Sequence, residues 1–442
     1  MNKNKPTILV IIGISGDLSK RKLLPAIGAI ATTLMIPEKF RIVGVTRKQD
    51  IKLEDLLKNT TNKDYLLQNT ELFEMDLNNG DDYKKLGKHL EKIKEEFGES
   101  TQCLFYLSVP PNVSKPIIEF IGNSGLGCEG ETKLLLEKPF GVDLKSATEL
   151  VGHINKYFKP EQIYRIDHYL AKETAQNIIV FRDGNSLFKK TWNKDFIERI
   201  EIIVSEEIGI EGRASFYEQT GALRDFQSHL LQLLALVLME LPQDENLAEV
   251  PNLRFEALKH IIIEDVNKDV IRGQYEGYKD EVKNTDSKVE TFVSIQLRST
   301  ADRWTGVPIT LTTGKALSEK LTEIRILYKK EKDHESNELF LQLQPKEEIQ
   351  FNMWAKRPGY EHRVSPHNLS FKYKEYYDIL PEAYEQVLFN AINSDHSLFT
   401  TSEEVLEAWR ILDVLQKAWE KSGDDLIIYK KGSTTDEIIN GK

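Results

Sequence analysis

The sequence predicts an α/β protein in which a doubly wound domain with a parallel sheet comes first and an α+β domain with a large, mostly antiparallel sheet follows. Two observations predict this. Up to about residue 140, apolar runs alternate with helical segments rich in lysine and glutamate, the pattern of parallel strands covered on both faces. After about residue 168, strand-like runs follow one another through short turns, which favours antiparallel pairing.

The first domain is expected over residues 1–167. Its first strand is the continuous apolar run TILVII, and a glycine-bearing turn and a helical stretch follow it. The next strand completes a β-α-β unit, which implies a right-handed crossover. This order predicts a Rossmann-type, dinucleotide-binding domain. Its strands are expected at residues 7–12, 40–47, 71–77, 102–109 and 132–140.

The second domain is expected over residues 168–442 and should bind substrate and mediate dimerisation. A helix is expected through TAQNIIVFRDG, and further helical stretches at residues 223–241 and 381–420 bracket the strands. A large sheet with one open face commonly packs on a twin subunit, so we expect a homodimer or a dimer of dimers. The strands are expected at residues 197–206, 288–298, 307–314, 321–330, 337–345 and 349–356.

Composition excludes several classes of function. The 442 residues carry a formal net charge of -11, which argues against a sequence-independent nucleic-acid binder and means that an anionic ligand needs a local basic pocket. No stretch approaches the ~18 apolar residues of a membrane span. The two cysteines, Cys103 and Cys128, have no metal-type spacing and are expected to be small buried hydrophobes in a reducing compartment. A cytoplasmic location is therefore expected.

The first turn, GISGDL, is a candidate phosphate-binding turn. A strand that runs into glycines and then a helix lets backbone N–H groups approach a pyrophosphate. The spacing is G-x-x-G, which is weak alone, and a simple tight turn is the alternative; its place after the first strand favours binding. The candidate cofactor-binding residues here are Gly13, Ser15, Gly16, Asp17 and Leu18.

Two other strand ends add to this site. The second strand ends in VGVTRKQ, where Arg47 replaces the carboxylate usual in NAD sites and favours NADP, although a solvated loop is the alternative. LLLEKPFG and YLSVPP end two further strands at the carboxyl edge of the sheet and contribute Lys138 and Pro110. A lysine there can reach both a nicotinamide and an alcohol being oxidised, but either segment is also compatible with a stiff turn.

The segment YRIDHYLAKE concentrates Asp167, His168, Tyr169 and Lys172 in a few residues. A solvated helix start would explain such a cluster in an arbitrary protein. Here it directly follows the predicted nucleotide-binding domain, which favours a functional site.

Taken in order along the chain, these motifs resemble those of the glucose-6-phosphate dehydrogenase family. The resemblance covers nearly the whole chain. It rests on the segments GISGDLSKRKLLPA, VGVTR, YLSVPP, EKPFG, DHYLAKE, GALRD, HLLQ, RGQY, ETFV, GVPITLTTGKAL, TEI and AYE.

The resemblance implies oxidation of D-glucose 6-phosphate to 6-phospho-D-glucono-1,5-lactone with NADP, or alternatively NAD, by direct hydride transfer without a metal. It implies that His229 is the catalytic base and that Asp167 orients it, a pairing that suits a group titrating near working pH. The substrate phosphate would lie against His168, Tyr169 and Lys172, since donors gather around a dianion. The other implied substrate-binding residues are Lys138, Glu206, Asp225, Lys315, Lys320 and Gln344.

Two departures from the family pattern leave alternatives open. Ala171 stands where glycine is usual, and RDFQSH is one residue shorter than the family's RDxxQNH. A relative with shifted phosphosugar or NAD specificity, or a catalytically weak NADPH-binding regulatory protein, would also fit. Five helical steps would turn two side chains about 140° apart, whereas four keep them on one face. We expect the chain to accommodate the missing residue before the helix, around Gly221. His229 should then be bonded to Asp167, and Asp225 should be displaced.

Overall fold

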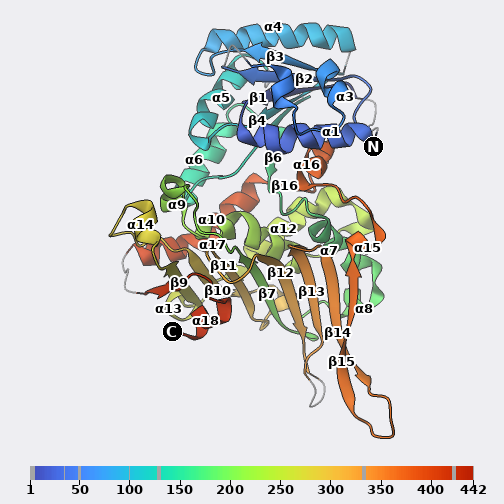
Figure 1. The fold of residues 1–442 in the computed structure, drawn as a ribbon, viewed down its shortest axis with the longest axis vertical. Helices are drawn as coiled ribbons and strands as arrows, with labels where there is room; N and C mark the ends of the chain where they lie inside the picture. Colours follow the sequence, from blue (N-terminus) through green and yellow to red (C-terminus); the bar gives the residue numbers. More distant parts are fainter. Residues whose placement is uncertain are drawn as a thin grey trace.

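The computed structural model arranges the chain around two sheets, the smaller one drawn at the top of Figure 1 and the larger one below it. It describes residues 5–33, 35–47, 51–98, 100–126, 131–330, 335–420 and 425–441.

The smaller sheet has seven strands in the order β16-β6-β5-β4-β1-β2-β3. Every neighbouring pair is parallel except β16 with β6. The five predicted strands are confirmed, while β6 and β16 were not predicted. The strands are β1 (Thr7–Ile12), β2 (Phe40–Thr46), β3 (Thr70–Glu74), β4 (Gln102–Leu107), β5 (Thr132–Leu136), β6 (Ile163–Ile166) and β16 (Phe399–Thr400).

Helices cover both faces of this sheet, as a doubly wound fold requires. Ile8, Val10 and Ile12 of β1 belong to one apolar core, shared with α4, α5 and α6. Leu9 and Ile11 point the other way, into a core shared with α1 and α16. The helices of this half are η1 (Ser19–Leu23), α1 (Leu24–Thr32), α2 (Leu53–Leu56), α3 (Lys63–Asn69), α4 (Gly80–Phe97), α5 (Pro111–Asn123), α6 (Leu144–Ile154) and η2 (Pro160–Gln162), with α16 (Ala383–Ile392) added from the C-terminal part.

The C-terminal part of the chain thus returns to the first sheet through α16 and β16. The last turn of α16 is fixed there, because Lys133 Nζ donates to Ala391 O and Gln102 Nε2 donates to Ile392 O at 2.9 Å. Figure 1 shows this red segment beneath the blue and cyan helices of the first half. The expected boundary between residues 167 and 168 stays a prediction.

The larger sheet runs in the order β15-β14-β13-β12-β7-β11-β10-β9-β17, with β8 paired to β10. It is mostly antiparallel, as predicted; β7 with β11 and β9 with β17 are parallel. The six predicted strands are found, whereas β8, β9, β15 and β17 were not predicted. The strands are β7 (Ile197–Ser205), β8 (Ile261–Ile262), β9 (Val270–Tyr275), β10 (Phe292–Ser299), β11 (Ile309–Gly314), β12 (Leu321–Tyr328), β13 (Glu338–Gln344), β14 (Glu348–Lys356), β15 (Val364–Lys372) and β17 (Leu426–Tyr429).

Helices gather on one face of this sheet, between it and the first domain (Figure 1). The predicted stretches at 223–241 and 381–420 are not continuous: a π-helical turn interrupts the first and β16 interrupts the second. The main helices are α7 (Glu173–Gly184), α8 (Ser186–Thr191), α9 (Ala214–Thr220), α10 (Leu223–Asp225), η3 (Phe226–Leu230), α11 (Leu231–Leu238), α12 (Val250–Lys259) and α17 (Ser402–Trp419). Shorter ones are η4 (Gln243–Glu245), η5 (Leu247–Glu249), α13 (Val266–Asp269), α14 (Tyr278–Val282), η6 (Asp302–Trp304), α15 (Tyr373–Tyr376) and α18 (Thr435–Asn440).

The composition predicts no membrane span and two buried cysteines. Among the described residues, no helix combines the length and apolar character that crossing a membrane demands. Cys103 is buried in β4, as expected, whereas Cys128 lies outside the described residues.

Candidate active site

The glycine turn after β1 lies very close to the backbone at the end of the neighbouring strand β4. Gly13 has φ +92°, and a Cβ there would lie 2.4 Å from Ser108 O at the end of β4. Only glycine fits such a position without strain. Ser19 Oγ joins both segments, donating to Gly13 O at 3.2 Å and lying 2.9 Å from Ser108 Oγ. The turn therefore packs directly against the neighbouring strand end.

The candidate cofactor-binding residues meet at the carboxyl edge of the first sheet. Gly13, Ser15, Gly16, Asp17 and Leu18 follow β1, and the exposed residues Arg47 and Pro110 follow β2 and β4. Both of these strands pair with β1. Because parallel strands end at the same edge, a dinucleotide in this crevice would meet all three segments.

Asp167 and His229 form a hydrogen-bonded pair. Asp167 directly follows β6, and His229 lies on η3. His229 Nδ1 is 2.9 Å from Asp167 Oδ1, which also accepts from the Tyr169 N–H at 3.0 Å. The expected contact is confirmed. When Nδ1 carries the proton and donates it to the carboxylate, Nε2 is the acceptor nitrogen of the ring.

Lys138 completes the centre from the end of β5. Its Nζ is 2.7 Å from His229 Nε2 and 3.5 Å from Asp167 Oδ1. Its side chain is 14% exposed, and that of Asp167 is 1% exposed. The Lys138 ammonium therefore lies beside the imidazole and close to both of its nitrogens, since Nδ1 is 3.0 Å away.

Burial and mutual charge set the protonation of these groups. Burial lowers the pKa of His229, and the charge of Lys138 lowers it further against the opposing effect of Asp167. Burial alone would raise the pKa of Asp167, but Lys138 and His229 reverse this and hold it below its ordinary value. Burial lowers the pKa of Lys138, while Asp167 and Glu137 oppose that shift. At neutral pH this leaves a carboxylate beside a neutral imidazole.

His168 and Tyr169 pack against His229 and extend the centre. The Tyr169 ring centroid lies 3.9 Å from that of His229, and the His168 centroid lies 4.9 Å from it. Burial, followed by Lys138, lowers the pKa of His168 well below the ordinary value. Asp167, His168 and His229 offer ligand atoms within 4.8 Å of one another. A metal ion at this point would face repulsion from the ammonium of Lys138.

These side chains open into a cavity of about 300 Å³ between the two domains. Glu206, Asp225 and Lys315 line it, and Lys315 Nζ pairs with Glu206 Oε2 at 2.6 Å. The expectation that Asp225 is displaced was wrong, because Asp225 and His229 line the same cavity. The full lining is Glu137, Lys138, Pro139, His168, Tyr169, Val204, Glu206, Arg213, Arg224, Asp225, Ser228, His229, Lys315 and Tyr384.

Lys172, Lys320 and Gln344 do not line this cavity but lie on its Tyr169 side. Lys172 Nζ is 6.0 Å from the centroid of the Tyr169 ring. Tyr169 Oη is 3.5 Å from Thr322 Oγ1, and Thr322 pairs in register with Gln344. Burial lowers the pKa of Lys172, and repulsion by the exposed Lys320 contributes to the shift. The charge of Lys320 therefore acts on Lys172 on this side of the cavity.

Comparison with known proteins identifies the family. The model for the NAD binding domain of glucose-6-phosphate dehydrogenase matches residues 10–177, and the model for its C-terminal domain matches residues 179–440. The chain belongs to the glucose-6-phosphate dehydrogenase family. The expectation drawn from the sequence motifs is thereby confirmed.

Relatives and solved structures agree with this assignment. The glucose-6-phosphate 1-dehydrogenase of Chlamydia muridarum is 35% identical, over 94% of this chain and 91% of the relative. A cytoplasmic enzyme of Arabidopsis thaliana is also 35% identical, over 96% and 88%. A glucose-6-phosphate dehydrogenase solved with glucose 6-phosphate superposes with a TM-score of 0.91 at 31% identity, covering 99% of this chain and 97% of that one. The Mycobacterium avium enzyme gives 0.83 at 29% identity, over 97% and 95%.

The shortened segment of this glucose-6-phosphate dehydrogenase family member is irregular on both sides of Asp225. Gly221 takes φ +55°, as expected for an adjustment before the helix, and its backbone packs against Glu290. Leu223 N donates to Glu290 Oε1 at 3.2 Å. The irregularity also enters the helix, because η3 from Phe226 to Leu230 is a π-helical turn. π-turns are often found at functional sites, and this one carries His229.

We expect Gly221→Ala to destabilise the protein and to lower activity. A Cβ at this position would lie 2.2 Å from Glu290 Oε1, and the positive φ adds strain. Strained backbone of this kind costs about 1–3 kcal/mol. Urea unfolding would measure the loss, with Gly306→Ala as control, since Gly306 has φ +85° and no atom within 4 Å of its Cβ position. Equal losses in both variants would show that the Glu290 contact has no effect.

Several polar or charged residues of the cavity were not identified as site residues from the sequence. They are Glu137, Arg213, Arg224, Ser228 and Tyr384. Glu137 and Arg224 adjoin the predicted Lys138 and Asp225, and Tyr384 belongs to the AYE motif, so a local signal existed for these three. Ser228 adjoins the predicted His229 in the same way, whereas nothing local pointed to Arg213.

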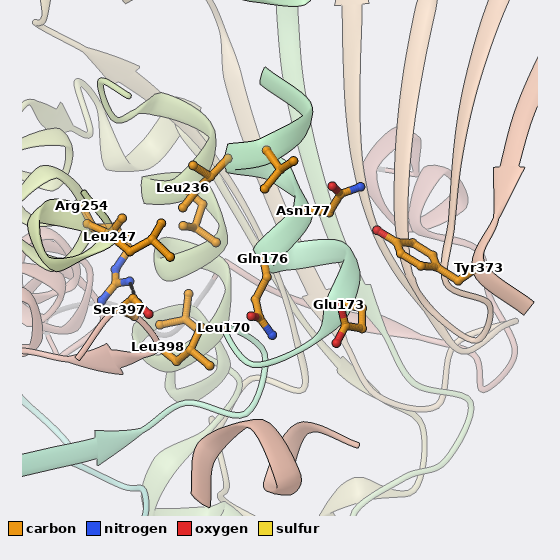
Figure 2. Close-up of a pocket in the computed structure, with 13 residues that line it drawn as sticks. Leu170, Glu173, Gln176, Asn177, Leu236, Leu247, Arg254, Tyr373, Ser397 and Leu398 are labelled. Carbon is orange, nitrogen blue, oxygen red and sulfur yellow. Dashed lines mark hydrogen bonds between the residues drawn. The ribbon is translucent and has the colours of Figure 1, made fainter. Parts of the chain in front are cut away.

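A second cavity of about 280 Å³ lies beside α7 and is drawn in Figure 2. Leu170, Leu236, Leu247 and Leu398 gather on one side of it, and Glu173, Asn177 and Tyr373 on the other. Its arginine, Arg254, is already bonded to Ser397 O and to Glu404. None of the candidate catalytic side chains lines this cavity, so the chemistry belongs to the first one.

Proposed function

We propose that the protein oxidises D-glucose 6-phosphate to 6-phospho-D-glucono-1,5-lactone and reduces NADP. The observation that carries this proposal is the buried Asp167–His229 pair beside Lys138, at the junction of the dinucleotide-binding edge and the cavity. Membership of the family and the similarity to a relative solved with glucose 6-phosphate support the substrate.

His229 acts as the general base in this reaction. Its Nε2 takes the proton of the C1 hydroxyl, and the Asp167 carboxylate stabilises the imidazolium that forms. Lys138 Nζ lies 2.7 Å from Nε2 and would donate to the substrate oxygen, which positions C1 at the carboxyl end of β5. NADP, when bound, accepts the hydride that leaves C1.

The rest of the site binds the sugar and its phosphate. Glu206 and Asp225 supply acceptors for sugar hydroxyls, with Lys315 paired to Glu206. The phosphate is assigned to His168, Tyr169 and Lys172, with Lys320 and Gln344 beyond them. Charge-assisted bonds from lysine to a dianion are stronger than neutral ones, which suits this cluster.

The first domain fits a dinucleotide. The Gly13 turn has no room for a side chain against Ser108, so its backbone lies close to the carboxyl edge of the sheet, where a pyrophosphate would bind. The residues that would hold the cofactor are Gly13, Ser15, Gly16, Asp17, Leu18, Arg47, Pro110 and Lys138. Arg47 at the end of β2 favours NADP, and NAD remains a second possible cofactor.

We expect Arg47→Ala to weaken NADP binding far more than NAD binding. Only NADP has a 2′-phosphate for the guanidinium to contact, and losing a charge-assisted contact costs about 1.5–3 kcal/mol. Dissociation constants of both cofactors would be measured by fluorescence titration, with Arg357→Ala as control, because Arg357 is an exposed arginine on the other domain. Equal weakening for NADP and NAD would contradict the assignment.

We also propose a homodimer, or a dimer of dimers, formed through the larger sheet. Apolar side chains are exposed on and beyond β15: Leu369 at 57%, Tyr376 at 66%, Tyr377 at 56% and Ile379 at 85%. Exposed apolar patches mark interaction sites. Light scattering should give two or four times the chain mass, and a single chain mass would refute this. We also propose that the protein is located in the cytoplasm, which cell fractionation would test.

An initial-rate assay tests the function directly. Reduction of NADP and NAD would be followed with glucose 6-phosphate, other hexose phosphates and glucose. We expect glucose 6-phosphate with NADP to give the highest kcat/KM. Preference for another phosphosugar would favour a relative with shifted specificity, and cofactor binding without turnover would favour a regulatory protein.

A further inference from the structure

The carboxylate of Glu137 lies between two tyrosine hydroxyls. Glu137 immediately precedes Lys138 at the end of β5. The Tyr106 hydroxyl, from the buried strand β4, donates to Glu137 Oε1. Tyr384, from α16, lines the active-site cavity together with Glu137, and its hydroxyl is near enough to oppose the rise that burial causes in the pKa of this carboxyl group. Two donors from distant parts of the chain therefore converge on one acidic side chain.

Glu137 competes with the catalytic groups for Lys138. The charged and titratable groups that act on Lys138 are Asp167 and His168 after β6, Asp225 and His229 around η3, and Glu137 itself. Lys138 nevertheless bonds His229 and pairs with Asp167. Among the described residues, no hydrogen bond or ion pair joins Lys138 to Glu137. The tyrosines occupy the carboxylate that would otherwise attract the ammonium.

We propose that Tyr384, together with Tyr106, is a positioning residue that holds Glu137 away from Lys138 and so directs the Lys138 ammonium to the Asp167–His229 pair. Because Tyr384 comes from the segment that returns to the first sheet, docking of α16 is a condition for an active centre. The inference rests on the proposed function for its kinetic consequences, but the placement of Lys138 can be measured without turnover.

Tyr384→Phe removes one donor and keeps the ring. A buried carboxylate that loses a hydrogen-bond donor should form an ion pair with the nearest cation. Glu137 should therefore pair with Lys138, and the pKa of Lys138 should rise. We expect kcat/KM for glucose 6-phosphate to fall about tenfold, in the range for losing one hydrogen bond to a charged group. Activity is lost at alkaline pH when the Lys138 ammonium, which donates to the substrate oxygen, gives up its proton. This alkaline limb of the pH profile should move to higher pH.

Glu137→Gln should shift that limb in the opposite direction, because it removes an anion near Lys138. In the double variant the tyrosine substitution should have no further effect, since residues that act through one another are not additive. An unchanged limb in Tyr384→Phe, or a full tyrosine effect in the Glu137→Gln background, would overturn the proposal.

Competitive acetylation read by peptide mass spectrometry would give the pKa of Lys138 independently of activity. We expect a higher value in Tyr384→Phe than in the native protein, and no change in Tyr376→Phe, an exposed tyrosine on α15. The same shift in both variants, or in neither, would refute the positioning role. If the shift occurs but the native protein does not oxidise glucose 6-phosphate, the proposed function fails and the placement of Lys138 by Tyr384 stands.

Discussion

His229→Asn lowers kcat for glucose 6-phosphate by roughly 10²-fold or more, the range for loss of a general base. The imidazole is 8% exposed, and its Nε2 is the basic atom nearest to Lys138 Nζ, at 2.7 Å. Asparagine keeps a hydrogen-bonding side chain beside Asp167 but cannot accept a proton. Binding of glucose 6-phosphate should therefore remain largely intact.

Steady-state kinetics and a substrate binding titration would separate these effects. His260→Asn is the matched control, because His260 is exposed and bonds Thr300 far from the cavity. A variant of His229 that keeps native kcat would exclude it as the base. A variant that no longer binds substrate would assign it a structural role instead.

Lys172→Ala raises KM for glucose 6-phosphate by about 10- to 100-fold, as expected for losing a charge-assisted contact to a dianion. Lys172 lies over the Tyr169 ring and close to Lys320, on the side of the cavity assigned to the phosphate. Activity on unphosphorylated glucose should scarcely change, because that sugar makes no use of the contact.

The comparison of the two sugars decides the role of Lys172. Lys259→Ala serves as control, since Lys259 pairs with Glu256 on the surface of α12. If Lys172→Ala lost activity on both sugars by the same factor, the phosphate-binding role would be wrong and a general effect on the fold would explain the loss.

The strands of the first sheet could be predicted because burial on both faces leaves an apolar run. β1 coincides with the predicted residues 7–12. β16 has only two residues, Phe399 and Thr400, and no pattern of that length is recognisable. β15 reads VSPHNLSFK and is largely exposed, so it has neither an apolar run nor a clear alternation. Its partner β14 determines its conformation instead, through nine paired positions.

The active-site residues also differ in whether sequence motifs predict them or contacts between distant segments determine them. The Asp167–His229 contact could be expected because family motifs fix both residues. The displacement of Asp225 was wrongly expected, since uniform α-helical geometry was assumed where η3 forms a π-helical turn. Tyr384 stands in the AYE motif, but its role at the site could not be predicted, because Tyr384 and Glu137 lie on two segments that only the return of α16 to the first sheet brings together.

The pH dependence of kcat/KM for glucose 6-phosphate tests the central claim most directly. Burial and Lys138 lower the pKa of His229 in the free protein, and the base is lost when the imidazole takes up a proton as the pH falls. Activity should therefore fall only below pH ~6.5, the ordinary histidine value. The residual activity of His229→Asn should lack this limb. A fall in kcat/KM that begins above pH ~6.5, or that persists unchanged in His229→Asn, would contradict the assignment of the Asp167–His229 pair as the catalytic base.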